Sequence, residues 1–292
     1  MNTLNMSDHS RDSAGLRYVY PVISRRAGGV SVGINLNPNN ACNWRCIYCQ
    51  VPNLTRGAAP PIDLVVLEQE LKSFLHELIH GDFMTQRVPL EARRINDIAL
   101  SGNGEPTSAA EFVQVIELVA RLKRDLALPA HIKIVLITNG SLLHQKNVQQ
   151  GVRLMAKHNG EVWFKLDRAS QAGMLLVNST VSSMEKVKKN VLHAISLCPT
   201  WLQTCWFALD GQPPSKQDEK DYLNFLREMQ NESAGNDIVP LWDDAKLKGV
   251  LLYSLARPSL QAEAPRLSAL SEQQLEVFAM RIRKLGAVVQ VA

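Results

Sequence analysis

The chain of 292 residues lacks the features that mark membrane-embedded and exported proteins. No apolar run approaches the roughly 18 residues of a transmembrane helix. The first fifteen residues are polar and have no apolar core of the kind found in signal peptides. We therefore expect a cytoplasmic protein without a membrane partner. The sequence also has no internal repeat and no low-complexity tract, which argues against a solenoid or a fibrous protein.

Net charge and cysteine are also scarce. The formal charge is only +4, and the Lys and Arg residues are spread along the chain, so a phosphate-rich partner is permitted but not required. Hydrophobic residues at 46% and charged residues at 21% are the balance of an ordinary globular protein. Five cysteines in a reducing compartment argue against a disulfide framework. Three of the five fall within eight residues, which indicates a metal site.

Apolar strand-like runs alternate with helical patterns from Val30 onward, as is typical of α/β proteins with a parallel sheet. The predicted strands are Val30–Leu36, Asp97–Leu100, Ile132–Ile137, Val162–Leu166, Leu202–Ala208 and Val250–Leu255. Six such units predict an incomplete (βα)6 TIM-like barrel, with an open doubly wound sheet as the alternative. In both folds the loops after the carboxyl ends of the strands carry the site. We expect residues 1–16 to be disordered and residues 17–292 to form the barrel domain.

Amphipathic helices are predicted between the strands. Two sets of apolar residues fall at helical spacing: Leu64, Leu67, Leu71, Phe74, Leu75 and Leu78, and then Phe112, Val115, Ile116, Val119 and Leu122. Two later helices are predicted to begin at capping boxes, Ser182 with Glu185 and Ser271 with Gln274. Gly286 is expected to end the last helix, and Val288–Val291 to add a terminal strand.

A cysteine loop follows the first predicted strand. Cys42, Cys46 and Cys49 stand in Cys-x3-Cys-x2-Cys spacing, which lets three thiolates point at one centre. Soft thiolates select iron–sulfur clusters or zinc. Structural zinc takes four protein ligands, and the other two cysteines, Cys198 and Cys205, are about 150 residues away. We therefore predict a [4Fe–4S] cluster with one open iron, and zinc or three packed thiols are the alternatives.

This loop, with Tyr48 just before the third cysteine, resembles that of the radical S-adenosylmethionine superfamily. The resemblance extends from about Arg17 to the end of the chain. It implies a partial barrel of radical S-adenosylmethionine type, with the cluster on Cys42, Cys46 and Cys49. It also implies that S-adenosylmethionine binds the open iron. One electron from a reductant such as flavodoxin or ferredoxin then cleaves the cofactor to methionine and a 5′-deoxyadenosyl radical, which abstracts hydrogen from a substrate.

The same resemblance implies S-adenosylmethionine contacts at the tips of the strands. The implied cofactor-binding residues are Tyr48, Gly102, Asn103, Gly104, Glu105, Pro106, Thr138, Asn139, Lys165, Asp167, Tyr253, Leu255 and Arg257. Glu105 matches a glutamate that binds the methionine amine, whereas Asn103 replaces the first glycine of the family's Gly-Gly-Glu-Pro segment. Hydrogen-bonded turns and local ion pairs are the alternatives at the later tips.

The fifth predicted strand carries the candidates for substrate contact. Period-two alternation places Gln203 and Cys205 on one face together with Trp201 and Phe207, and we expect that face to look toward the radical. A thiol in that position can donate a hydrogen atom. Plain buried packing is the alternative for Cys205, and it is our expectation for Cys198.

Three segments besides the cysteine loop resemble most a group of bacterial iron–sulfur oxidoreductases often labelled wyosine-synthetase-like: Ser24-Arg25-Arg26, Gly104–Thr107 and Ala256–Pro258. The substrate is left open, and RNA is one class of it. An RNA-binding module, alone or as part of a tRNA-modifying enzyme, would use Arg25, Arg26 and Arg45 to follow phosphates near the cluster. A non-catalytic iron–sulfur electron carrier or scaffold is the other alternative. Glu105 argues against a carrier, because such a protein needs no amine-binding strand end.

Overall fold

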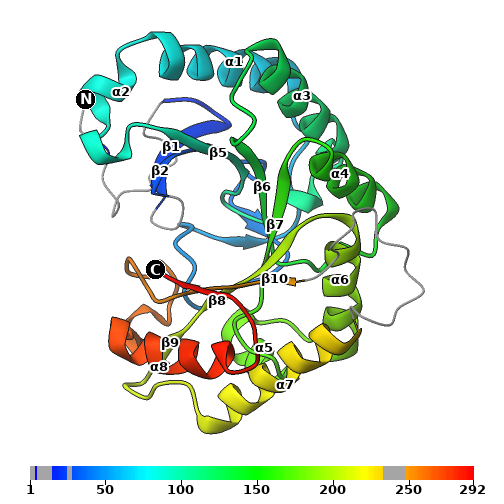
Figure 1. Cartoon of the computed structure of the whole chain (residues 1–292), viewed down its shortest axis with the longest axis vertical. Coiled ribbons are helices and arrows are strands. Elements are labelled where there is room, and N and C mark those ends of the chain that lie inside the picture. The colour runs from blue at the N-terminus through cyan, green and yellow to red at the C-terminus, as the bar shows by residue number, and fades with distance from the viewer. Residues whose placement is uncertain (1–3, 5–14, 25–27, 233–246) are drawn as a thin grey trace.

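A curled sheet of eight strands forms the centre of the molecule in the computed structural model, which describes Leu4 and residues 15–24, 28–232 and 247–292. In sheet order the strands are β1 Val19–Ser24, β2 Gly29–Ile34, β5 Ile95–Leu100, β6 Lys133–Thr138, β7 Gly160–Lys165, β8 Thr200–Cys205, β10 Leu247–Tyr253 and β12 Val289–Val291. Neighbours from β2 to β12 pair in parallel, and β1 pairs with β2 antiparallel. The result is a half-barrel with helices on its outer side (Figure 1).

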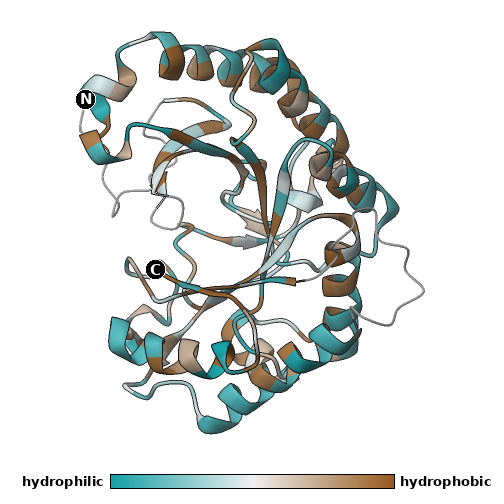
Figure 2. Cartoon of the chain, in the orientation of Figure 1, coloured by the Kyte–Doolittle hydropathy of each residue, from teal (hydrophilic) through white to brown (hydrophobic). Residues whose placement is uncertain are grey.

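The helices follow the strands in alternation and pack against the outer face of the sheet. Their bounds are α1 Leu64–His80, α2 Phe83–Arg87, α3 Phe112–Asp125, α4 Lys146–Ala156, α5 Gln171–Asn178, α6 Met184–Leu197, α7 Lys216–Glu232 and α8 Glu272–Arg283. Hydrophobic and hydrophilic residues alternate along the helices (Figure 2), and the buried residues of α1 and α3 are all apolar. The main core therefore lies between helices and sheet. No helix in these described stretches is both long and apolar enough to cross a membrane.

The predicted six-unit partial barrel is confirmed, with two additions at its edges. All six predicted strands are present as β2, β5, β6, β7, β8 and β10. The terminal strand predicted at Val288–Val291 is also present, as β12. Strand β1, which contains Pro21, was not predicted from the sequence. Proline is tolerated at the edge of a sheet because no ladder hydrogen bond is required of its nitrogen there.

One predicted strand is shorter than expected. The run Leu202–Ala208 leaves the sheet after Cys205, and its end forms β9, Phe207–Leu209. This short strand pairs antiparallel with β11, Leu267–Ala269. A second small pair joins β3, Ala41–Cys42, to β4, Thr55–Arg56, so that both ends of the cysteine loop are held together.

One of the two predicted capping boxes is confirmed and the other is wrong. Ser271 and Gln274 cap each other at the start of α8, as predicted. The prediction at Ser182 is wrong by one residue, because the side chain of Ser183 accepts the Lys186 amide at the start of α6. The segment predicted to be disordered, 1–16, lies mostly outside the described residues. Within it, Leu4 is buried and its amide donates to the carbonyl of Arg87.

Candidate functional site

A cavity of about 280 Å³ lies inside the half-barrel, between the cysteine loop and the carboxyl ends of the strands. Fifteen of the residues predicted from sequence line it: Cys42, Cys46, Tyr48, Cys49, Gly102, Asn103, Gly104, Glu105, Asn139, Lys165, Gln203, Cys205, Tyr253, Leu255 and Arg257. Three other predicted cofactor-binding residues, Pro106, Thr138 and Asp167, are not part of the lining. The fold therefore brings widely separated segments to one cavity.

The three thiols of the cysteine loop all face this cavity and are half-buried. Burial raises the pKa of Cys42 to about 11 and the pKa of Cys46 to about 12. Both are neutral thiols at pH 7, so a metal that binds there must displace their protons. Within the part of the chain that is described, no three His, Cys, Asp or Glu side chains converge closely enough to hold one metal ion. A cubane distributes three cysteines over three irons and needs no such convergence on a single ion.

Two glycines let the loop after β5 lie directly against the cysteine loop. A Cβ on Gly104 would stand 2.1 Å from the carbonyl oxygen of Ala41 and 2.5 Å from Asn37. A Cβ on Gly102 would stand 2.3 Å from Oδ1 of Asn35. Any larger residue at either position would push the two loops apart, because these distances are far below van der Waals contact.

Asn103, the departure from the family's paired glycines, links the same two loops. Its backbone amide donates to Oδ1 of Asn35 at 3.0 Å, and its side-chain amide donates to Oδ1 of Asn40 at 2.6 Å. Its own Oδ1 is buried without a partner among the described residues. The asparagine is therefore accommodated as a cross-link between the two loops.

Glu105 is a buried carboxylate held by four hydrogen bonds. Its Oε1 accepts from the amide and hydroxyl of Thr107 at 3.1 and 2.5 Å and from the hydroxyl of Thr138 at 2.6 Å. Its Oε2 accepts from the backbone amide of Asn139 at 2.7 Å. Burial raises the pKa of Glu105, and these four donors oppose that rise. Thr138 thus positions Glu105 from behind, while Glu105 itself faces the cavity.

Asn139 connects this network to the cysteine loop. Its side-chain Nδ2 donates to Oδ1 of Asn43 at 2.7 Å, and its Oδ1 accepts from the amide of Ser141 at 3.0 Å. Asn43 also donates to the hydroxyl of Ser141 at 2.8 Å. The residue that follows Cys42 is therefore fixed to the end of β6.

Asp167 is a second buried carboxylate, and it is turned away from the cavity. Its Oδ2 accepts from the hydroxyl of Tyr48 at 2.6 Å and from Nδ2 of Asn178 at 2.7 Å. Its Oδ1 accepts from the amide of Cys205 at 2.9 Å. Three protein donors from three different segments thus occupy the carboxylate. Its geometry fits support of the cysteine loop rather than direct contact with a ligand.

Lys165 presents an ammonium group to the cavity beside Tyr48. Its Nζ lies 5.0 Å from the centroid of the Tyr48 ring, a cation–π distance. Burial alone would lower the pKa of Lys165, but neighbouring acidic groups, Tyr253 and Asp167 foremost, outweigh burial and raise it. The amine is therefore charged at neutral pH and can pair with a carboxylate or accepting oxygens of a ligand.

The end of β8 divides its side chains between two faces. Gln203 and Cys205 line the cavity, and burial raises the pKa of Cys205, so its thiol is neutral. Thr204 and Trp206 face the helices: the hydroxyl of Thr204 lies 2.5 Å from that of Tyr222 in α7, and Trp206 stacks on Phe278 in α8.

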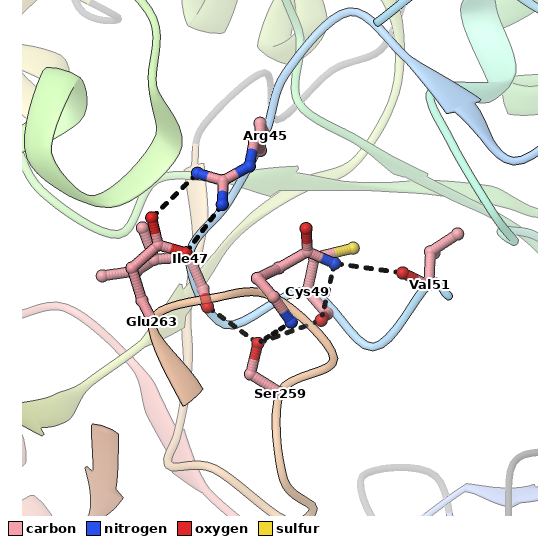
Figure 3. Close-up of polar contacts among 7 residues, drawn as sticks. Arg45, Ile47, Cys49, Val51, Ser259 and Glu263 are labelled. Carbon is pink, nitrogen blue, oxygen red and sulfur yellow. Dashed lines mark hydrogen bonds and ion pairs between the residues drawn. The ribbon is translucent and has the colours of Figure 1, made fainter. Parts of the chain in front are cut away.

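The segment after β10 binds the cysteine loop through hydrogen bonds and an ion pair, as Figure 3 shows. We call residues 259–263 the strap. The hydroxyl of Ser259 lies 2.8 Å from the carbonyl oxygen of Ile47 and 3.1 Å from that of Cys49. Glu263 binds Arg45 through two contacts of 2.8 and 2.9 Å. The strap therefore anchors the loop on both sides of Cys46.

Several residues at the site were not predicted from sequence. Asn178 and Ser259 contact the cysteine loop from positions that have no motif of their own and are far from it in sequence. Asn43 lies within the loop and accepts a hydrogen bond from Asn139. Of the predicted residues, Arg25 and Arg26 lie outside the described part of the chain. Cys198 is buried in the core beneath the helices, as expected for a packing thiol.

No family model matches the sequence. A UPF0026 protein of Helicobacter pylori strain J99 is 31% identical over 212 residues, which cover 72% of this chain and 61% of the relative. A UPF0026 protein of Methanocaldococcus jannaschii is 29% identical over 133 residues, 45% of this chain and 36% of the relative. The chain thus spans less than two thirds of the length of these relatives.

Solved structures decide the fold. Spore photoproduct lyase superimposes with a TM-score of 0.59 at 10% identity, covering 94% of this chain and 80% of that chain. SuiB of Streptococcus suis bound to S-adenosylmethionine superimposes with a TM-score of 0.56 at 12% identity, covering 91% and 50%. The chain has the radical S-adenosylmethionine fold. TYW1 with a lysine–pyruvate adduct bound gives a TM-score of 0.53 at 13% identity, covering 87% and 73%. The resemblance seen in the cysteine loop is thereby confirmed at the level of the radical S-adenosylmethionine fold.

Proposed function

We propose that this protein is a radical S-adenosylmethionine enzyme, with a [4Fe–4S] cluster on Cys42, Cys46 and Cys49. A reduced cluster would supply the electron that cleaves S-adenosylmethionine to methionine and a 5′-deoxyadenosyl radical, which takes hydrogen from a substrate. One observation carries the proposal: three cysteines in Cys-x3-Cys-x2-Cys spacing and the buried Glu105 line the same cavity in a radical S-adenosylmethionine fold.

Glu105 is the group best suited to bind the methionine amine. Among the described residues, Oε2 of Glu105 accepts a hydrogen bond from the amide of Asn139, whereas a carboxylate oxygen has room for two. Thr107 and Thr138 hold the other oxygen, so the carboxylate is orientated before a ligand arrives. A buried cationic amine would also offset the burial that raises the pKa of Glu105.

Lys165 is the group best suited to bind the negatively charged part of the cofactor. Its ammonium would bind the carboxylate or ribose oxygens of the cofactor, because it faces the cavity as a cation. The backbone of Tyr253, Leu255 and Arg257, at the end of β10, would take the adenine. These assignments leave Asp167 as a support of the loop, through Tyr48.

Gln203 and Cys205 would face the substrate. Both line the cavity from β8, and a neutral thiol is the protonation state that can donate a hydrogen atom. The substrate is not identified by these residues, and tRNA modification is one candidate. A flavodoxin or ferredoxin would serve as the one-electron reductant.

The test begins with the cluster. Protein purified and reconstituted without oxygen should be brown and contain about four irons per chain. Replacement of Cys42, Cys46 or Cys49 by alanine should abolish the iron and the colour, while the matched Cys198→Ala variant should keep both. Stoichiometric zinc in freshly prepared protein, with no iron, would contradict the assignment.

Cofactor cleavage separates an enzyme from an electron carrier. With dithionite and S-adenosylmethionine, the reconstituted protein should slowly release 5′-deoxyadenosine even without a substrate. An iron–sulfur carrier would hold the cluster but would neither bind nor cleave S-adenosylmethionine. A salt-dependent affinity for tRNA would favour an RNA substrate, because it reports neutralised phosphates.

A further inference from the structure

Asn178, the last residue of α5, joins the cysteine loop to the buried Asp167. Its side-chain Nδ2 lies 3.2 Å from Sγ of Cys46 and 2.7 Å from Oδ2 of Asp167. The residue is 1% exposed, so water does not compete for these contacts. Cys46 is 132 residues away in the chain, and no motif in the sequence links the two residues.

The last turn of α5 also holds the backbone on both sides of Cys46. The amide of Arg45 donates to the carbonyl of Asn178 at 3.2 Å, and the amide of Ile47 donates to the carbonyl of Val177 at 2.9 Å. These two bonds use carbonyl groups that the end of a helix otherwise leaves unsatisfied. Cys46 is therefore kept at a constant position relative to the side chain of Asn178.

Asp167 determines which way the Asn178 amide points. An ionised carboxylate only accepts hydrogen bonds, so the NH2 group of the amide must face Asp167. The hydroxyl of Tyr48 and the amide of Cys205 hold that carboxylate in place from other directions. Because one hydrogen of the NH2 group is directed at Asp167, the other is available to Cys46 Sγ. A flipped amide would set its oxygen against the carboxylate and is disfavoured.

We propose that Asn178 is a positioning residue that raises the reduction potential of the cluster by donating a hydrogen bond to the sulfur of Cys46. Reduction adds negative charge to the cluster and its thiolates, and a donor to a ligand sulfur stabilises the more negative state. This inference rests on the proposed function, because it requires a cluster on Cys46. Cys42 receives its nearest donor differently, from the backbone amide of Trp44 at 3.4 Å, which a side-chain substitution cannot remove.

The experiment is a redox titration of the reconstituted cluster, followed by electron paramagnetic resonance, in wild type and Asn178→Leu. Leucine has nearly the same volume and no donor. At the potential that half-reduces the wild-type cluster, the reduced-to-oxidised ratio of the variant should be about tenfold lower. This ratio corresponds to a reduction potential about 59 mV lower for a one-electron couple. Asn190→Leu is the matched control, since Asn190 is a buried asparagine that donates to the carbonyl of Gly140. Its potential should equal that of wild type.

A second variant and a second readout keep the outcome decisive. If Asn178→Leu loses its cluster, Asn178→Ser decides, because its side chain is too short to reach Cys46 and Asp167 together while the backbone contacts of α5 remain. In resonance Raman spectra, the iron–sulfur bands of wild type should shift after exchange into deuterium oxide, and the shift should be smaller in the variant. An unchanged or higher potential in a variant that retains its cluster overturns the inference. A wild-type protein that binds no cluster overturns the proposed function instead.

Discussion

Glu105 and Asp167 are two buried carboxylates at the ends of β5 and β7, and they differ in what surrounds them. Glu105 accepts hydrogen bonds from Thr107, Thr138 and the backbone amide of Asn139, all from the loop after β5 and the end of β6. It still faces the cavity. Asp167 is enclosed by donors from the cysteine loop, α5 and β8, and it does not line the cavity. Similar positions at strand ends can therefore serve a ligand in one case and the protein in the other.

The largest expected effect is on stability at Asp167. Asp167→Ala should leave the hydroxyl of Tyr48, the amide of Cys205 and the side chain of Asn178 without an acceptor, at about 1–3 kcal/mol for each buried donor. We expect the free energy of unfolding of the cluster-free protein to fall by about 3–5 kcal/mol in urea titrations. Glu105→Ala should lose clearly less, because Glu105 lines the cavity and its truncation lets water from the cavity reach the donors that it leaves. Equal losses would remove the distinction between the two carboxylates.

The next effect is on ligand affinity at Glu105. Glu105→Gln should weaken binding of S-adenosylmethionine to the reconstituted protein by roughly 10- to 150-fold, because a buried amine loses a charge-assisted partner of about 1.5–3 kcal/mol. Isothermal titration calorimetry measures this directly. Glu161→Gln is a suitable control, as that carboxylate pairs with Lys133 instead of lining the cavity. Unchanged affinity in Glu105→Gln would mean that this residue does not bind the amine.

A smaller effect on S-adenosylmethionine affinity is expected at Thr138, which supports Glu105 from the end of β6. Thr138→Val removes the hydroxyl that donates to Oε1 of Glu105 but keeps the shape of the side chain. The loss of one hydrogen bond, about 0.5–1.5 kcal/mol, should weaken S-adenosylmethionine binding roughly 2- to 12-fold without abolishing the cluster. Full wild-type affinity, measured in the same titrations, would show that Glu105 needs no support from β6.

The smallest effect concerns a third carboxylate, Glu263 on the strap. Arg45 lowers the pKa of Glu263 through a hydrogen bond, and the pair is partly exposed. Glu263→Gln should cost at most about 1 kcal/mol at pH 7. A lowered pKa in the folded state gives stability that is present above the unfolded value of 4.5 and lost as pH falls through the folded value. The difference between variant and wild type should therefore disappear in urea titrations at progressively lower pH, and a difference that grows there would contradict this reading.

Much of the fold was predictable because the signals are local. Each of the six parallel strands is an apolar run, and the spacing of residues such as Leu67, Leu71 and Leu78 identifies the buried face of α1. The edge strand β1 was missed because Pro21 is a breaker in most strands. The start of α6 was misplaced by one residue because Ser182 and Ser183 are adjacent and either can cap a helix.

The site was predictable only in part, since local sequence identifies a chemical group but not its partners. The cysteine spacing and the glycine-rich tip at Glu105 stand out in the chain, so both could be assigned to one site. Nothing local marks Asn178 or Ser259, which reach the cysteine loop from more than 100 residues away. Asp167 and Thr138 were expected at the ligand, but their hydrogen bonds are directed into the protein.

The sequence by itself determined the elements, the cysteine loop and the types of group available, because helical period, strand period and residue spacing are properties of short segments. Only the tertiary structure decided which strand-end groups face the cavity and which support them. That choice depends on contacts between strands and loops that are distant in the chain: Tyr48 with Asp167, Thr138 with Glu105, and Asn178 with Cys46. A buried polar group must find a partner, and the fold determines which partner lies within reach.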